Sequence, residues 1–137
     1  MKRLLSALLA LCMAFSLCTG ALAAESGTGF SNFRPVNLYA YNSFSDVSGW
    51  YAKYVASVYT LGLMQGSIDE NGERAFKPNG LITLAETVTL ADRIHAAYHG
   101  IDQSFTQGSV WYQVYVDYAL ENGILLEEEY SNYNQPA

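Results

Sequence analysis

Apolar residues recur every three or four positions in two stretches of the chain, the spacing typical of one buried face of an α-helix. The first stretch predicts a helix that begins near Ser48 and ends near Gly62, and the second predicts a helix that follows Thr83 and stops at Gly100. The expected inner face of the first helix is Val47, Trp50, Tyr54, Val58 and Leu61. The expected inner face of the second is Ala85, Val88, Ala91, Ile94 and Tyr98. The pattern predicts an all-α fold.

Both predicted helices carry end signals. Asp46 and Ser48 are residue types that cap helix N-termini, and Gly62 tolerates the left-handed conformation just beyond a helix end. Thr83 and Glu86 form an S/T-x-x-E capping box, in which each side chain accepts a hydrogen bond from the other residue's backbone N–H. These signals predict two short, well-bounded helices.

A polar loop, residues 66–80, separates the two helices. Its Asp, Asn and Gly residues predict turns, because an EF-hand calcium loop needs Gly at its sixth position and Gly72 comes at the fourth. Phe76 and Pro78 are expected to hold the loop against the core.

The first helix pattern returns 61 positions later in the chain. Five positions align between the two copies: Phe44 with Phe105, Trp50 with Trp111, Tyr51 with Tyr112, Tyr54 with Tyr115 and Val55 with Val116. The alignment runs without a gap to Gly62 and Gly123. Such self-similarity predicts helical units that stack because one unit cannot bury its apolar face alone. We expect one full unit over 44–100 and a second over 105–137 that is truncated before its second helix.

The anchors of this repeat resemble the S-layer homology (SLH) motif of bacterial surface proteins. They are Phe44-x-Asp46-Val47, Trp50-Tyr51, Tyr54-Val55, Gly62-Leu63-Met64-x-Gly66, Phe76-x-Pro78-Asn79 and Ile82-Thr83-Leu84-Ala85-Glu86. The resemblance implies SLH-type helix-loop-helix repeats, three of which pack into a three-fold helical prism, so this sequence would form a partial prism. It also implies non-covalent anchoring to the cell wall, because grooves between SLH motifs hold a secondary cell-wall polysaccharide, a peptidoglycan-linked polymer that is often pyruvylated.

The resemblance assigns polymer binding to five residues: Asp46, Trp50, Gly66, Thr83 and Glu86. Each also has a structural explanation, as a cap, a core residue or a turn, and for Trp50 a core position is favoured over a carbohydrate contact. The family usually has I-T-R-A-E where this chain has Leu84, so a cation suited to a sugar carboxylate is missing. Lys53 and Arg93 are the cations that could compensate.

The N-terminal residues have the pattern of a secretory signal peptide, with a basic start, a short apolar run and an A-x-A end. We expect cleavage after residue 23, a linker over 24–43, and no membrane span in the mature chain. Both cysteines, Cys12 and Cys18, would leave with the signal, so the mature chain would hold no disulfide.

The chain is acidic, with 13 Asp and Glu against 7 Lys and Arg and a formal net charge of −6. This charge argues against nucleic acid and anionic membranes as partners. His95 and His99 lie four apart, but a zinc site wants three or four ligands, so helix-end positions are favoured and no metal or cofactor is expected.

Catalytic motifs are missing from the sequence, and no enzymatic activity is expected. Asp46, Glu86 and Asp92 could in principle pair as glycosidase carboxylates, but cap and surface roles explain each of them. The sequence therefore predicts a secreted cell-wall and cell-surface (S-layer) protein, with self-association or missing C-terminal repeats covering its open helix faces. Two alternatives are a structural or protein-interaction module that has lost polymer binding, and the N-terminal anchoring fragment of a larger surface enzyme.

Overall fold

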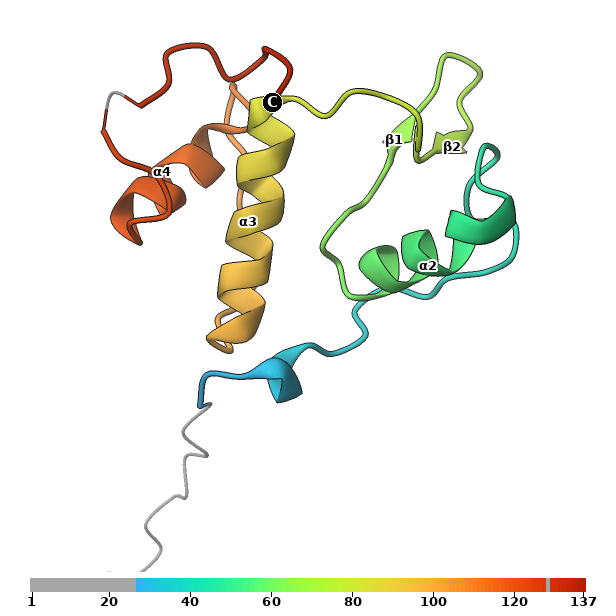
Figure 1. Cartoon of the computed structure of the whole chain (residues 1–137), viewed down its shortest axis with the longest axis horizontal. Coiled ribbons are helices and arrows are strands. Elements are labelled where there is room, and N and C mark those ends of the chain that lie inside the picture. The colour runs from blue at the N-terminus through green and yellow to red at the C-terminus, as the bar shows by residue number, and fades with distance from the viewer. Residues whose placement is uncertain (1–26, 128) are drawn as a thin grey trace, which may run out of the picture.

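The computed structural model describes residues 27–127 and 129–137 (Figure 1). The predicted signal peptide, both cysteines and the first residues of the predicted linker lie outside the described residues. The elements follow one another along the chain as η1 (Phe30–Asn32), η2 (Gly49–Tyr51), α2 (Ala52–Thr60), β1 (Ser67–Ile68), β2 (Arg74–Ala75), α3 (Leu84–Tyr98) and α4 (Gln113–Glu121).

The described fold is mostly helical, with one small antiparallel hairpin that the all-α prediction left out. Ser67 pairs with Ala75, and Ile68 pairs with Arg74. The Asp69 carboxylate closes the turn between the strands by accepting hydrogen bonds from the backbone N–H groups of Asn71 (2.9 Å) and Glu73 (2.8 Å). The predicted turn is thereby confirmed.

The capping box at the start of α3 is confirmed. The Thr83 hydroxyl accepts from the Glu86 N–H at 3.3 Å, and the Glu86 carboxylate accepts from the Thr83 N–H at 2.8 Å. Residues 133–137 return to the same helix end, where the N–H groups of Leu84 and Ala85 donate to carbonyl groups of this segment at 2.9 and 2.8 Å. The otherwise unpaired donors of the first helical turn are therefore satisfied.

The predicted inner face of the first helix is wrong at Trp50 and Tyr54, whereas Val47 packs against the buried cluster as predicted. Trp50 is 79% exposed and Tyr54 55% exposed, whereas Val55 and Tyr59 are buried. Val55 and Tyr59 follow Tyr54 and Val58 by one position each, so apolar residues cover two neighbouring faces of α2 and their spacing does not decide which face is buried. The buried face packs on Phe44, with Tyr39 and Phe76 around it, so Phe76 holds the loop to the core as predicted.

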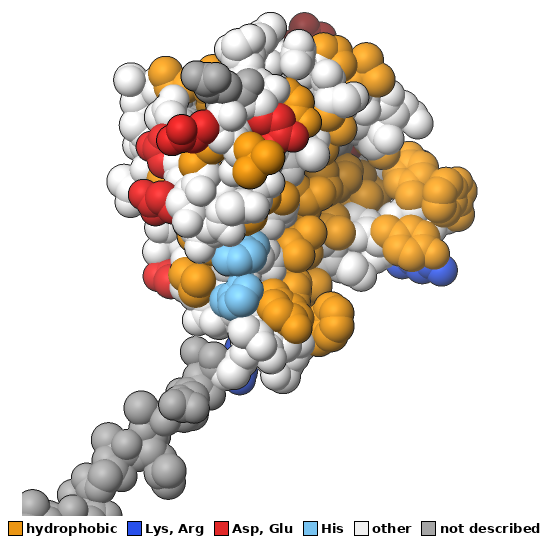
Figure 2. Space-filling view, turned by 60° about the vertical axis from the view of Figure 1, so that its left-hand side comes forward, with side chains coloured by type: hydrophobic (Ala, Val, Ile, Leu, Met, Phe, Trp, Pro, Cys, Tyr) orange, Lys and Arg blue, Asp and Glu red, His pale blue; other side chains and the backbone are white. Residues whose placement is uncertain are grey.

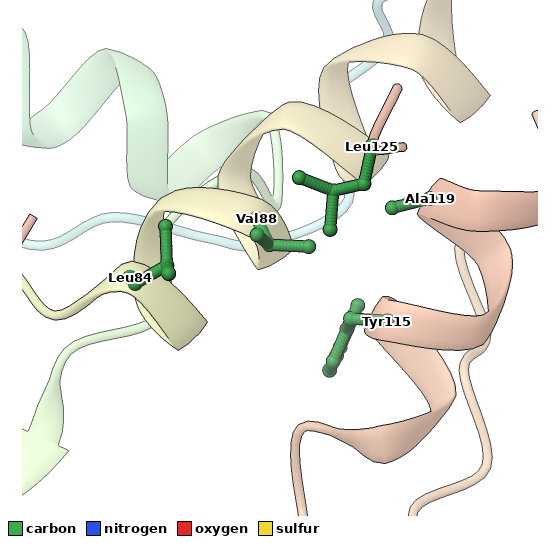
Figure 3. Packing of buried hydrophobic residues seen from close by; sticks show 5 residues of the cluster. All are labelled: Leu84, Val88, Tyr115, Ala119 and Leu125. Atoms are coloured by element: carbon green, nitrogen blue, oxygen red, sulfur yellow. The ribbon is translucent and has the colours of Figure 1, made fainter. Parts of the chain in front are cut away.

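A second core lies between α3 and α4 (Figure 3). Leu84 and Val88 of α3 pack against Tyr115 and Ala119 of α4, together with Leu125. Ala85 and Val88 are buried as predicted, but Ile94 and Tyr98 are partly exposed, because the buried face continues through Asp92, Ala96 and Ala97 instead. Helix α3 thus joins the two copies of the repeat, with α4 on one side and the α2 and hairpin segment on the other (Figure 1).

Candidate polymer-binding groove

A groove of about 550 Å³ lies where the first copy of the repeat meets the second. One wall comes from the segment after α2 and includes Gly66, and another comes from α3 and includes Glu86 and Arg93. Lys77 and Trp111 complete the groove from the approach to α3 and from the start of the second copy. The groove therefore combines two cations, one carboxylate and an indole ring.

The structure brings together three of the seven residues that the sequence singled out: Gly66, Glu86 and Arg93. The groove lining does not include the other four, Asp46, Trp50, Thr83 and Lys53. Trp50 is exposed on η2, and the Lys53 ammonium group lies 4.9 Å from the centroid of the Tyr54 ring. Trp50 is therefore not a core residue, contrary to the favoured expectation.

Asp46 shapes the groove without lining it. Its carboxylate accepts hydrogen bonds from the backbone N–H groups of Phe76 at 2.8 Å and Lys77 at 2.6 Å. Lys77 has a positive φ of 56°, a conformation that costs energy for a residue other than glycine. The helix-cap role expected for Asp46 is wrong, because the carboxylate instead holds the groove segment across 30 residues of chain.

Gly66 lies where a side chain cannot fit. Its φ is 70°, and a Cβ atom would come within 2.5 Å of the Phe44 ring and 2.7 Å of the Ala75 carbonyl oxygen. The glycine lets the hairpin leave the core at this angle, so its structural role as a turn is sufficient to explain it.

Arg93 is fixed at the boundary between the copies. Its guanidinium donates to the Leu63 carbonyl at 3.3 Å and to the Tyr115 hydroxyl at 2.9 Å, and lies 5.5 Å from the centroid of the Tyr115 ring. Because guanidinium carries five N–H donors, these two bonds orient the group and leave others for a ligand.

The groove is also lined by three residues to which the sequence assigned no role in binding: Trp111, Lys77 and Phe76. Trp111 is 40% exposed, and its ring stands edge-on to Tyr112 at a centroid distance of 5.6 Å. It is the repeat counterpart of Trp50, so the shift of 61 positions was the signal that could have found it. The loop cation Lys77 had no comparable signal.

Leu84 belongs to the α3–α4 core and not to the groove. It is buried against Tyr115 and Val88 (Figure 3), although it stands at the position where the family usually has arginine. An arginine introduced here would place its charge in an apolar cluster. The missing cation is therefore not restored by changing this residue alone.

Asp92 is a buried carboxyl group, so the surface role expected for it is wrong. Neither of its oxygens has a hydrogen-bond partner within the described part of the chain. Burial raises the pKa of Asp92 to about 7. The pKa of nearby Tyr118 is raised by its own burial and then by the negative charge of Asp92. Asp92 does not line the groove, so it does not face Glu86 across a cleft as a glycosidase pair requires.

The two histidines form a pair near the end of α3, visible side by side in Figure 2. Their ring centroids are 4.3 Å apart, and His95 Nδ1 lies 2.9 Å from the Tyr118 hydroxyl. Partial burial and the charge of His99 lower the pKa of His95. Across residues 27–127 and 129–137, no group of three or more His, Cys, Asp or Glu side chains could hold a metal ion.

Residues 43–88 match the family model of the S-layer homology domain, and this chain therefore contains an S-layer homology domain. The match covers the first helix, the hairpin and the capping box, and stops before Arg93 and the second copy. No curated protein and no solved structure matches the chain. Within the described part of the chain, no helix has the length and apolar character needed to cross a membrane.

Proposed function

We propose that this chain is a secreted cell-surface protein that attaches non-covalently to the bacterial cell wall. The S-layer homology domain is an anchoring module and not a catalytic one, which supports attachment as the general role. The ligand that we propose is an anionic secondary cell-wall polysaccharide, bound in the groove between the two copies of the repeat.

The orientation of the Arg93 guanidinium is the observation on which this proposal rests. The guanidinium is oriented by the Leu63 carbonyl and the Tyr115 hydroxyl before any ligand arrives. A planar, pre-oriented guanidinium suits the carboxylate of an acidic sugar, because two parallel N–H groups can donate to its two oxygens. In this proposal, Arg93 supplies the cation that the family usually has at position 84.

Trp111 and Lys77 support the same ligand class. The indole of Trp111 offers a flat apolar surface to one face of a sugar ring, and an indole N–H is a hydrogen-bond donor. Lys77 adds a second positive charge to the groove of a protein whose formal net charge is −6. Attraction to an anionic polymer would therefore be local, and it would weaken as salt screens these exposed charges.

The proposal is tested by comparing two arginine variants in a pull-down on purified cell-wall sacculi. Arg93→Gln should lower the affinity about tenfold or more, because a hydrogen bond to a charged group contributes about 1.5–3 kcal/mol. Arg34→Gln makes the same charge change on an exposed residue outside the groove, and it should bind like the wild-type chain. Equal affinities of the two variants would overturn the groove assignment.

A second candidate function is a structural module that no longer binds the polymer. The burial of Leu84, which leaves the family's cation position apolar, favours this reading. It predicts that the wild-type chain and both arginine variants fail to bind sacculi, although all three are folded by circular dichroism.

A further inference from the structure

A second pocket, separate from the groove, lies between the segment that precedes η2 and the β1–β2 hairpin. Its volume of about 500 Å³ is within the range of roughly 300–1,000 Å³ that is typical of small-molecule sites. It shares no lining residue with the groove. Its lining joins apolar and planar polar side chains: Phe44 and Val47, the phenol ring of Tyr41, and Asn42, Glu73 and Arg74.

Hydrogen bonds fix both walls of this pocket. The Ser43 N–H donates to the Ala40 carbonyl at 2.9 Å, and the Ser43 hydroxyl accepts from the Ala40 N–H at 2.7 Å, which closes the turn that forms one wall. The Ser45 N–H donates to the Arg74 carbonyl at 3.0 Å and so ties this turn to β2, across 29 residues of chain. The pocket is therefore formed before a ligand arrives, and binding would require little further ordering.

The guanidinium of Arg74 is oriented by a tyrosine. It donates a hydrogen bond to the Tyr59 hydroxyl and lies 5.5 Å from the centroid of the Tyr59 ring. Tyr59 is buried in the core around Phe44, so its hydroxyl is a fixed acceptor. Because a guanidinium carries five N–H donors, the bond to Tyr59 orients the group without using up its donors.

The charges of the lining indicate a neutral ligand. Glu73 and Arg74 contribute one negative and one positive charge, whereas the groove has two cations and one carboxylate. An anionic ligand attracted by Arg74 would be repelled by Glu73. Neighbouring hydroxyl groups of a sugar suit such a lining, because a carboxylate accepts two hydrogen bonds, a guanidinium donates two, and the amide of Asn42 can do both.

We propose that this pocket binds one neutral pyranose ring of a polysaccharide chain. The polar side chains of Asn42, Glu73 and Arg74 pair with its hydroxyl groups, and the exposed ring of Tyr41 packs on its apolar face. The proposal does not rest on the anionic polymer or on Arg93, because the pocket and the charge of its ligand are both different. A neutral sugar bound here would give the protein a second point of attachment to a polysaccharide, which strengthens binding when both sites are occupied at once.

The test is a titration of the isotope-labelled full chain with two uncharged tetrasaccharides, followed through the backbone amide resonances in NMR spectra. Cellotetraose has hydroxyl groups only and chitotetraose carries N-acetyl groups, so the two arms distinguish a plain hexose chain from an amino-sugar glycan. At least one of them should shift the amide resonances of Ser43, Ser45 and Arg74 in a saturable way. The amide resonance of Gly66, in the groove, should stay in place.

Two variants and one matched control assign the binding to the pocket. Tyr41→Ala should weaken the affinity about fivefold, because an aromatic contact is lost, and Asn42→Ala should weaken it as well. Leu38→Ala changes a side chain of the same segment that is 91% exposed and outside the pocket lining, and it should bind like the wild-type chain. All three residues are exposed, so each variant is expected to stay folded, which circular dichroism checks.

Three results would overturn the proposal. The first is that neither tetrasaccharide shifts the pocket resonances, and the second is that the shifts occur at the groove instead. The third is that Tyr41→Ala and Asn42→Ala bind as tightly as Leu38→Ala. None of these results bears on the attachment proposed for Arg93, which concerns an anionic ligand and is measured on sacculi.

Discussion

The guanidinium of Arg93 donates a hydrogen bond to the hydroxyl of Tyr115 at 2.9 Å. Arg93 lies on the second helix of the first copy, and Tyr115 on the first helix of the second copy. The same tyrosine is buried in the α3–α4 core, so the packing of the two copies determines where the groove cation lies. Stacking of the repeats and placement of the binding group are thus linked through one side chain.

Tyr115→Phe should weaken polymer binding more than it weakens the fold. The change keeps the buried ring but removes the hydroxyl that orients Arg93, at a cost to stability of about 1 kcal/mol. We expect a several-fold loss of affinity for sacculi, and no further loss when Tyr115→Phe is added to the Arg93→Gln chain. Additive losses in this double-mutant cycle, measured by co-sedimentation, would contradict a positioning role for Tyr115.

Asp92 should make the fold less stable as pH rises. Its pKa is about 7 in the folded chain against an ordinary value of 3.8. The contribution of Asp92 to the free energy of unfolding is therefore fully present below pH 3.8 and is lost as pH rises through about 7. The loss is on the order of 4 kcal/mol, at 1.36 kcal/mol for each unit of pKa.

Urea unfolding at pH 4, 6 and 8 measures this effect, with Asp92→Asn as the comparison. The lowered pKa of His95 acts with the opposite sign, because it costs stability as pH falls, so the difference between the two chains isolates the carboxyl group. Identical pH dependence of the wild-type chain and Asp92→Asn would show that Asp92 is not the group responsible.

Asp46→Ala should destabilise the first copy of the repeat. The two backbone N–H groups that the carboxylate accepts from, those of Phe76 and Lys77, would lose their charged partner. We expect a loss on the order of 2–3 kcal/mol in the free energy of unfolding. Asp102→Ala removes an exposed carboxylate that, among the described residues, bonds only to Ser104, and it should change the free energy of unfolding by less than about 0.5 kcal/mol. Equal urea midpoints for the two variants would be evidence against this role.

Leu84→Arg should unfold the α3–α4 core and should not strengthen polymer binding. The change buries a charge among Val88, Tyr115 and Leu125, and we expect it to cost more than about 3 kcal/mol. Leu81→Arg adds the same charge at an exposed position and should leave the thermal midpoint nearly unchanged. A Leu84→Arg protein as stable as the wild-type chain would mean that this side chain can turn out of the core.

Local signals predicted the helix ends and the turn, because a few neighbouring atoms decide them. The capping box of Thr83 and Glu86 and the turn at Asp69 are of this kind. The buried face of the first helix could not be predicted in the same way, since apolar residues cover two neighbouring faces of α2 and packing on Phe44 decides which of them is buried.

The candidate site was predicted only in part, because tertiary contacts decide which residues meet. Arg93 was proposed as a cation, but its orientation depends on Tyr115, which lies 22 residues away. The sequence pointed to Trp50, whereas the groove contains its repeat counterpart Trp111. The hydrogen bonds of Asp46 to the groove loop span 30 residues, and nothing in the local sequence distinguishes them from a helix cap.

The most direct test of the proposed anchoring is a binding isotherm of residues 24–137, the mature chain that the sequence predicts, on purified sacculi with and without chemical removal of the secondary polymer. We expect saturable binding to intact sacculi that weakens as salt is raised and is lost when the polymer is stripped. Equal binding to intact and stripped sacculi, or none to either, would contradict the claim that this chain attaches to the wall through that polymer.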